Sequence, residues 1–332
     1  MTHITEHKRI HLIGIGGCSM SGLASILKNR GYYVQGSDRA ESPFTERLKE
    51  LGVPVFIGHD AKNIGDCDLI IFSAAIKSDN VERAEAKRRG IPELERSEAL
   101  GQLTEGYESV VGIAGCHGKT TITSMLALIC ERGGPDATVH IGGFVDFLNG
   151  GVRLGAHDMF ITEACEYVES FLTLRPTIAL INNIDNDHLD YYGDMEHIVA
   201  AFKKFAALLP ENGLLIGNTD DFRVRALMAE HTGRKLSYGM KDADYTPANI
   251  TYDDNGCPGF DIMFKGEKLM HIQLRIPGEH SVMNAIAAAA VAREIGADDK
   301  CIVSALNAFR NTRRRFEYYG ERNGVKYYCL LY

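Results

Sequence analysis

Residues 112–121 read Gly-Ile-Ala-Gly-Cys-His-Gly-Lys-Thr-Thr, a glycine-rich turn that decides how the middle of the chain folds. An apolar run that begins at Val110 leads into this turn. Apolar residues at helical spacing follow it, namely Ile122, Met125, Leu126 and Ile129. A turn of this kind between a buried strand and a helix lets backbone N–H groups converge on an anion, and the helix N-terminus adds partial positive charge. The sequence therefore predicts a binding site for a nucleoside triphosphate.

The spacing inside the turn is shorter than that of the Walker pattern. Ile113 stands five residues before Gly118, where the Walker pattern has glycine, so the turn has the form Gly115-x-x-Gly118-Lys119-Thr120. Lys119 can reach the outer phosphates, and the Thr120 hydroxyl can ligate Mg²⁺. A glycine-rich loop that carries a lysine by chance, without binding phosphate, would show the same sequence pattern. The strand before it and the amphipathic helix after it favour a true phosphate loop.

Length and composition limit the classes of protein that the chain can belong to. With 332 residues, 45% of them hydrophobic and 24% charged, it is long enough for two globular domains. The net charge of −8 argues against nucleic acid or an anionic membrane as a general partner. No apolar stretch approaches the length of a membrane span, and the first residues lack the apolar core of a signal peptide. We therefore expect a cytoplasmic protein.

The 8 cysteines are scattered without any Cys-x-x-Cys pair. In a cytoplasmic chain this spacing favours free thiols over disulfides or a zinc site. Cys18, Cys116 and Cys165 lie at glycine turns or at the end of an expected strand. No partner base can be identified for any of them, so we interpret them as small packing residues rather than nucleophiles.

A second glycine turn lies near the N-terminus. The apolar run Ile10–Ile13 ends at Gly14-Ile15-Gly16-Gly17, and helical apolar spacing follows. Ser19 holds the third glycine position of a dinucleotide fingerprint, while Asp38 lies at the distance expected for a ribose contact. NAD(P) is one ligand that this turn could take. The second nucleotide loop favours a different sugar-bearing nucleotide or diphosphate here.

Strands and helices alternate along most of the chain, which predicts parallel sheets with ligands at the carboxyl ends of the strands. The expected elements of the second region are strands at 159–161, 178–181 and 214–216, helices at 200–209, 284–295 and 301–309, and short extended stretches with hairpin turns over 246–276. The fold class is thus α/β. A Rossmann-like parallel-sheet domain precedes a P-loop ATPase-type α/β domain that has a small β-hairpin region.

Two strand ends after the phosphate loop carry ligands of the type that divalent cations prefer. Glu163 follows the strand at 159–161, and Asp187-His188 follows the strand at 178–181. Because the carboxyl ends of parallel strands share one edge, both sets point toward the phosphate loop. Carboxylate and imidazole ligands beside a triphosphate suit Mg²⁺ or Mn²⁺ rather than structural zinc.

Six motifs in order resemble the Mur ligase family of ATP-dependent enzymes, which build the peptide stem of bacterial cell-wall precursors. The motifs are His11–Gly17 with Met20-Ser21-Gly22, Gly115–Thr121, Glu163–Glu166 with Ser170-Phe171-Leu172, Asn183–His188, Pro277-Gly278-x-His280 with Asn284-Ala285, and Arg314–Glu317. They cover about 300 residues, so chance resemblance is excluded in practice. Cys116 stands where the family usually has threonine, Cys165 where it usually has aspartate, and Ser281 where asparagine often follows the histidine.

The resemblance implies an activity and a domain order. ATP would phosphorylate the lactyl carboxylate of UDP-N-acetylmuramate to an acyl phosphate, which the amine of L-alanine would attack. Residues 1–106 would bind the UDP-sugar, 107–315 would bind ATP, and 316–332 would begin a third domain that binds the amino acid. The family continues beyond this point, whereas the sequence ends at Tyr332. We therefore expect nucleotide and UDP-sugar binding but little ligation by these residues.

The resemblance also implies a role for each motif residue. The catalytic group would be Lys119, Glu163 and His188, with Thr120, Glu163 and His188 as ligands of Mg²⁺ or Mn²⁺. The implied ATP contacts are Gly115, Cys116, His117, Gly118, Lys119, Thr120, Thr121, His280, Asn284, Arg314 and Arg315. The implied UDP-sugar contacts are Gly14, Gly16, Gly17, Ser37, Asp38, Ser73, Ala74 and His117.

Three alternatives stay open at this point. The first is a nicotinamide-dependent oxidoreductase, which only the N-terminal glycine turn supports. The second is a non-catalytic protein that binds a UDP-sugar and ATP. The third is a related ligase that adds a peptide, rather than L-alanine, to UDP-N-acetylmuramate.

Overall fold

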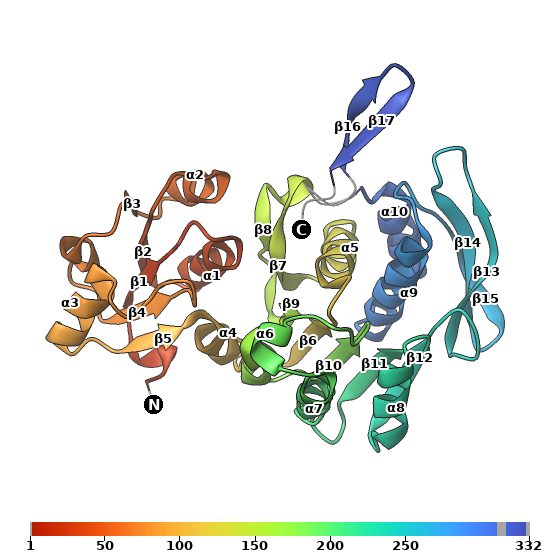
Figure 1. Ribbon diagram of the computed structural model, residues 1–332, viewed down its shortest axis with the longest axis horizontal. Helices are drawn as coiled ribbons and strands as arrows, with labels where there is room; N and C mark the ends of the chain where they lie inside the picture. The colour runs from red at the N-terminus through yellow and green to blue at the C-terminus, as the bar shows by residue number, and fades with distance from the viewer. Residues whose placement is uncertain (1, 311–316, 330–332) are drawn as a thin grey trace. The chain divides into compact units, whose positions relative to one another are not determined.

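The computed structural model describes residues 2–310 and 317–329, which form two compact units. Unit 1 comprises the chain up to residue 106 together with 140–154, and unit 2 comprises 107–139 and the chain from 155 onward. The segment 140–154 thus belongs with unit 1, although it lies within the part of the sequence expected to form the central domain. Figure 1 shows the elements of both units.

Unit 1 is built on a five-stranded parallel sheet with the order β3-β2-β1-β4-β5. Its strands are β1 (Arg9–Ile13), β2 (Tyr33–Asp38), β3 (Val55–Ile57), β4 (Leu69–Phe72) and β5 (Glu93–Glu95). Its helices are α1 (Cys18–Asn29), α2 (Pro43–Glu50), α3 (Val81–Arg89) and α4 (Arg96–Thr104), with 3₁₀ turns η1 (Ile4–Glu6) and η2 (Ala61–Ile64). Ile13 pairs with Ser37 on one side and Phe72 on the other, so these three strands end together. This register brings the N-terminal glycine turn beside the ends of β2 and β4.

A second sheet has ten strands in the order β15-β14-β13-β12-β11-β10-β6-β9-β7-β8, and most of it belongs to unit 2, whereas its residues between 140 and 154 belong to unit 1. Its strands are β6 (Ser109–Ala114), β7 (Ala137–Val145), β8 (Gly150–Arg153), β9 (Ala156–Ala164), β10 (Ile178–Ile181), β11 (Leu214–Asn218), β12 (Arg234–Tyr238), β13 (Tyr245–Tyr252), β14 (Pro258–Phe264) and β15 (Glu267–Gln273). The strands from β12 to β9 run parallel, whereas β13, β14 and β15 pair antiparallel. The predicted α/β fold, with its parallel first sheet and its hairpin region, is confirmed.

Helices cover both faces of the parallel part of this sheet, with α5, α9 and α10 on one face and α7 and α8 on the other (Figure 1). The helices are α5 (Lys119–Glu131), α6 (Leu189–Tyr192), α7 (Met195–Ala206), α8 (Phe222–Glu230), α9 (Glu279–Glu294) and α10 (Asp299–Ala308), with 3₁₀ turns η3 (Asp146–Leu148) and η4 (Tyr167–Thr173). Every residue of α5 from Thr120 to Cys130 is buried because α9 packs against it as well as the sheet. The run Ala287–Ala290 in α9 is fully buried, and such small side chains allow close helix packing.

Capping residues explain where some helices differ from the sequence prediction. The helix expected at 200–209 begins at Met195, because the Asp194 carboxylate accepts a hydrogen bond from His197 N at 2.9 Å. The helix expected at 301–309 begins at Asp299, because the side chain of Asp298 accepts a hydrogen bond from Lys300 N and caps it. A two-stranded hairpin, β16 (Glu317–Arg322) and β17 (Val325–Cys329), ends the described part of the chain. None of the helices in that part has the length and apolar character needed to span a bilayer.

Candidate active site

The phosphate loop, residues 115–121, joins β6 to α5 at the carboxyl edge of the parallel sheet. Its two glycines have positive φ angles, +138° at Gly115 and +87° at Gly118, which side chains other than glycine rarely adopt. A Cβ atom at Gly118 would overlap Asn182 Nδ2 and lie 2.7 Å from Asn284 Oδ1. Both backbone angle and space therefore require glycine at 118. The loop approaches its neighbours closely enough to be held in one shape.

The end of β10 holds the loop in place through two asparagines. Asn183 Oδ1 accepts a hydrogen bond from His117 N at 2.8 Å, and both Asn182 Nδ2 and Asn183 Nδ2 donate to His117 O, at 2.9 and 3.0 Å. The hydroxyl of the fully buried Tyr238 donates to Asn182 Oδ1 at 2.6 Å. Burial raises the pKa of Tyr238 well above its usual value, so this hydroxyl stays a donor. The sequence motifs assigned no role to Asn182 or Tyr238.

Cys116 lies inside the loop as a buried thiol. Its Sγ donates to Asp185 O at 3.3 Å and accepts from Asp185 N at 3.2 Å. Burial raises the pKa of the thiol to about 12, so it stays protonated near neutral pH. The thiol thus replaces the usual threonine as a packing and hydrogen-bonding group. The neighbouring His117 side chain is exposed, with Nε2 at 3.5 Å from Asp185 Oδ2.

Thr120 and Glu163, both expected to ligate the cation, lie together. Thr120 Oγ1 donates to Glu163 Oε2 at 3.1 Å. Strand β9 pairs in parallel with β6 and sets Glu163 opposite Ile113, one residue before the end of β6. The pairing therefore carries the Glu163 carboxylate to the start of α5. This contact places an oxygen pair beside the loop.

Lys119 makes an ion pair with Glu166, a residue to which the sequence motifs gave no separate role. Lys119 Nζ lies 2.7 and 3.0 Å from the two Glu166 carboxylate oxygens, and Glu166 is only 1% exposed. His188 Nε2 lies 3.8 Å from Glu166 Oε1 on the other side. Burial alone would lower the pKa of Lys119, but the Glu166 charge outweighs it and raises that pKa. The sequence signal for Glu166 was its place at the end of the Glu163–Glu166 motif, which gave it no role of its own.

Ligand atoms of Glu166, Asp187 and His188 all lie within 4.8 Å of one another. His188 is held at this place with a left-handed backbone, φ +55°, and its ring packs on that of Tyr167 at 4.6 Å between centroids. Two carboxylates and an imidazole, with the nearby Thr120 hydroxyl and Glu163 carboxylate, form a donor set that fits Mg²⁺ or Mn²⁺. The structure thus groups Glu166, to which the sequence motifs gave no separate role, with the expected Asp187-His188 pair.

The remaining residues expected to contact ATP divide into three groups. Asn284 is buried in α9, and its Oδ1 accepts from Asn182 Nδ2 at 3.4 Å, so it stands directly behind the loop. His280 is exposed at the start of α9, beside Gly278. Arg314 and Arg315 lie outside the described residues.

The N-terminal glycine turn of unit 1 is closed by the end of β2. Gly14 N and Ile15 N donate to Ser37 O at 2.8 and 3.0 Å, and Gly16 N donates to Asp38 Oδ2 at 2.8 Å. Gly17 is exposed and is the N-cap residue of α1. The Ser73-Ala74 turn follows β4, and a Cβ atom at Gly14 would contact Ser73 Cβ at 3.5 Å. The structure therefore brings these expected UDP-sugar contacts to one edge of the sheet.

The Ser37 side chain points into the interior rather than toward this turn. Its Oγ donates to Glu82 Oε2 at 2.5 Å, and Asn63 Nδ2 and His11 Nε2 also contact the Glu82 carboxylate, at 2.7 and 3.1 Å. Ser37, His11 and Glu82 are all fully buried. Burial raises the pKa of Glu82, but the hydrogen bonds from His11 and Ser37 outweigh it, so the net shift is downward. The charged carboxylate thus joins the middle of β1 and the end of β2 to the start of α3.

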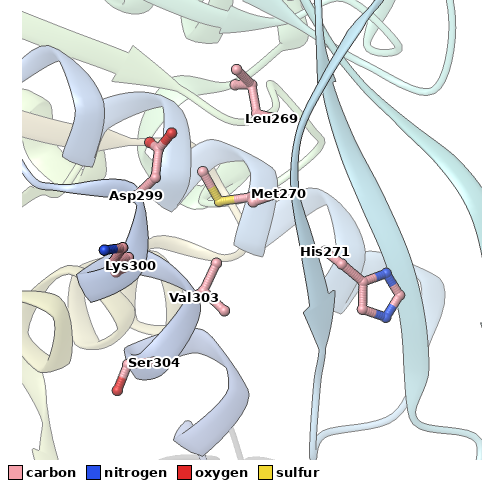
Figure 2. Close-up of a pocket in the computed structure, with 7 residues that line it drawn as sticks. All are labelled: Leu269, Met270, His271, Asp299, Lys300, Val303 and Ser304. Carbon is pink, nitrogen blue, oxygen red and sulfur yellow. The ribbon is translucent and has the colours of Figure 1, made fainter.

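A separate pocket of about 430 Å³ lies between β15 and α10. It is lined by Leu269, Met270, His271, Asp299, Lys300, Val303 and Ser304. Figure 2 shows Met270 and Val303 between the strand and the helix, whereas the His271 ring projects away from them. None of the residues expected to bind nucleotide lines this pocket. We place the candidate site at the phosphate loop, because ammonium, hydroxyl, carboxylate and imidazole groups converge there.

Comparisons with known proteins find two family models that match the chain. The family model "Mur ligase family, catalytic domain" matches residues 9–108, and "Mur ligase middle domain" matches residues 113–292. The chain is 44% identical to a UDP-N-acetylmuramate–L-alanine ligase from Alkaliphilus metalliredigens over 98% of this chain and 71% of the relative.

Two solved structures are similar across most of the chain. A UDP-N-acetylmuramate–alanine ligase from Thermotoga maritima has a TM-score of 0.83 and 29% identity, over 96% of this chain and 72% of that one. A UDP-N-acetylmuramate:L-alanyl-γ-D-glutamyl-meso-diaminopimelate ligase from Neisseria meningitides has a TM-score of 0.81 and 28% identity, over 93% of this chain and 100% of that one.

Proposed function

Because the chain belongs to the Mur ligase family of ATP-dependent amide ligases, we propose that it joins L-alanine to the lactyl carboxylate of UDP-N-acetylmuramate in the cytoplasm. The observation that carries the proposal is the phosphate loop with Lys119 and Thr120 at the start of a buried helix, directly beside two strand-end carboxylates. The 44% identity to a ligase of this specificity supports L-alanine as the amino acid.

The chemistry explains why the site needs these groups. A carboxylate is a poor electrophile, so transfer of the γ-phosphoryl group of ATP to the lactyl carboxylate supplies a leaving group. The amine of L-alanine then forms the amide bond as phosphate departs. Loop N–H groups and Lys119 would bind and orient the phosphates. When bound, Mg²⁺ or Mn²⁺ would offset the negative charge of the phosphoryl oxygens. Thr120, Glu163 and His188 would hold the cations, together with Glu166 and Asp187.

Unit 1 would bind the UDP-sugar at the glycine turn. Gly16 N donates to the Asp38 carboxylate. The exposed Gly17 and the Ser73-Ala74 turn lie at the same edge of the sheet and would contact the UDP-sugar there. An acid at this place is the group that contacts a ribose hydroxyl in sheets of this type. The assignment gives each glycine turn its own substrate, with the sugar nucleotide in unit 1 and ATP in unit 2.

Calorimetric titration tests the two binding sites separately. We expect ATP with Mg²⁺ and UDP-N-acetylmuramate each to bind the 332-residue chain, and NADPH to bind no better than background. UDP-N-acetylglucosamine, which lacks the lactyl carboxylate, is the matched control ligand and should bind more weakly than UDP-N-acetylmuramate. Binding of NADPH without binding of ATP would contradict the proposal and favour an oxidoreductase.

Phosphate release tests the reaction. Release that requires ATP, UDP-N-acetylmuramate and L-alanine together supports the proposed ligase. Binding of both nucleotides without release, even after the third domain of a family member is supplied, would instead support a non-catalytic binding protein.

A second candidate is a ligase that adds a peptide to the same sugar nucleotide. The similarity to the Neisseria ligase, with its TM-score of 0.81 over the whole of that chain, is the observation that favours it. The discriminating experiment replaces L-alanine by the tripeptide L-alanyl-γ-D-glutamyl-meso-diaminopimelate. Release with the tripeptide and none with L-alanine would establish this candidate in place of the first.

A further inference from the structure

The Lys119 ammonium has an acceptor for each of its three N–H groups within the chain. Its Nζ lies 2.5 Å from Gly115 O, 3.4 Å from Cys116 O and 2.7 Å from the nearer Glu166 oxygen. The side chain is only 14% exposed. A phosphate that is to bind Lys119 must therefore take the place of at least one of these partners. Of the three, only Glu166 carries a charge.

Glu166 is a fixed and buried partner. It is 1% exposed, and the Tyr192 hydroxyl donates to its backbone carbonyl, which ties the end of β9 to α6. In the part of the chain that the structure describes, the cationic or titratable nitrogens within 4 Å of its carboxylate belong to Lys119 and His188. Lys119 is the only permanently charged one of the two. The Glu166 charge is therefore compensated chiefly by the lysine that ATP needs.

Moving Lys119 toward a phosphate would leave that carboxylate buried without its partner. Breaking a buried ion pair in this way is strongly unfavourable, and a phosphate nearby adds like-charge repulsion. A second cation next to Glu166 would remove both penalties. Asp187 and His188 lie within 4.8 Å of Glu166 and can share such a cation with it.

We propose that Glu166 is a positioning residue that holds Lys119 within the loop until nucleotide arrives and then exchanges the lysine for a divalent cation. This exchange makes tight ATP binding depend on the cation. The inference rests on the proposed function, because it requires ATP as the ligand of the phosphate loop. Glu166 itself acts through Lys119 rather than on the reacting atoms.

The variant Glu166→Gln tests the exchange, because glutamine keeps the shape of the side chain and removes its charge. ATP affinity is measured by calorimetry in EDTA and in Mg²⁺. For the unaltered chain we expect Mg²⁺ to tighten ATP binding by at least about 10-fold, within the usual range of coupling between two ligands. In the variant, binding in EDTA should be roughly 10-fold tighter than in the unaltered chain, and Mg²⁺ should change it by less than about 3-fold.

Asp261→Asn is the matched control. Asp261 is also a buried carboxylate in unit 2, 5% exposed, and pairs with Lys268 Nζ at 2.8 Å, but it lies on β14 outside the phosphate site. We expect this variant to keep the Mg²⁺ dependence of the unaltered chain. The variant Glu166→Asp keeps the charge on a shorter side chain that holds Lys119 less closely, so its ATP affinity in EDTA should lie between those of the unaltered chain and Glu166→Gln.

Two failures are distinguishable. If the unaltered chain does not bind ATP with or without Mg²⁺, the proposed function is wrong. If the chain binds ATP but Glu166→Gln keeps the full Mg²⁺ dependence, the exchange is wrong while the proposed function stands. Thermal melting identifies a Glu166→Gln variant that does not fold. In that case Glu166→Asp provides the test, because its shorter side chain must hold Lys119 less closely. If its affinity for ATP in EDTA equals that of the unaltered chain, the proposed exchange is wrong.

Discussion

The two glycine turns, Gly14–Gly17 in unit 1 and Gly115–Gly118 in unit 2, share a local design but are completed differently. Each follows a buried parallel strand and begins a helix. In unit 1 an amide of the turn donates to the Asp38 carboxylate at 2.8 Å. In unit 2 the turn carries Lys119, and its backbone is held by the asparagines at the end of β10.

The difference comes from the neighbouring strands rather than from the turns. Strand β2 delivers an acid to the turn in unit 1, which suits contact with a sugar hydroxyl. Strands β9 and β10 deliver Glu163, Glu166 and amide groups to the turn in unit 2, which suits phosphate with a cation. On the proposed function, a glycine turn between strand and helix provides a place for a nucleotide, and the adjacent strand ends decide which part of the nucleotide it contacts.

Lys119→Met should affect the two turns most differently, because only the turn in unit 2 carries a lysine. We expect ATP affinity to fall by at least about 100-fold through loss of charge-assisted contacts to phosphate. The affinity for UDP-N-acetylmuramate should stay within about 2-fold if the units bind independently. Calorimetric titration with each ligand measures both effects.

The same variant should also lower the stability of unit 2, because it leaves the Glu166 carboxylate buried and unpaired. A loss of about 3 kcal/mol in the free energy of unfolding is typical of such a change. The double variant Lys119→Met/Glu166→Gln is the control, and it should recover much of the stability without recovering ATP affinity. Equal stability of the single variant and the unaltered chain in urea unfolding would refute a charged Lys119–Glu166 pair.

Substitution of alanine for the glycine that caps each helix, Gly17 in unit 1 and Gly118 in unit 2, should lower stability by different amounts. Gly118 has φ +87° and no space for a Cβ atom, so Gly118→Ala should cost about 2–3 kcal/mol through strain and overlap. Gly17 has φ −67°, and its Cβ would lie 3.4 Å from Gly14 O, an ordinary contact. Gly17→Ala should therefore cost under about 1 kcal/mol. Urea unfolding measures the free energy of unfolding of both variants. Similar losses in Gly118→Ala and Gly17→Ala would contradict this expectation.

Acid should lower the free energy of unfolding of unit 1 through His140, which lies near the glycine turn Gly14–Gly17. In unit 1 this residue is 3% exposed, and its Nε2 lies 3.1 Å from Ser19 O in the first turn of α1. Burial lowers the pKa of His140 to about 4 from 6.5. Between these values the unfolded chain binds a proton that the folded chain does not, so stability falls as pH drops from about 6.5 toward 4. The loss from pH 7 to pH 5 should be about 2 kcal/mol.

Urea unfolding at pH 7 and pH 5 measures this effect, and His140→Gln is the control because glutamine does not titrate. The difference in stability between the two pH values should be smaller in His140→Gln by about 2 kcal/mol. The lowered pKa of Glu82 acts at still lower pH, because its stabilising charge is lost only as pH falls below the usual range of a glutamate. An equal pH dependence in both proteins would show that His140 is not a buried neutral group.

Several parts of the site could be predicted because local sequence and chemistry suffice for them. Gly118, Lys119 and Thr120 follow from the strand, turn and helix pattern, and Glu163 from the end of the next strand of the sheet. Glu166 could not be assigned in this way, because only the path of the chain after β9 turns its carboxylate onto Lys119. Tyr238 was also missed, since the contact that joins it to Asn182 spans 56 residues.

By itself the sequence determined the α/β fold, the two glycine turns and the family, because strand and helix periodicity, turn glycines and ordered motifs are local properties of the chain. Only the tertiary structure decided what surrounds each turn. It buried Ser37 on Glu82 instead of exposing it, added Glu166 to the Asp187-His188 pair, and paired Lys119 with a carboxylate. These arrangements depend on strand order and on the burial of charge, which no single stretch of sequence contains.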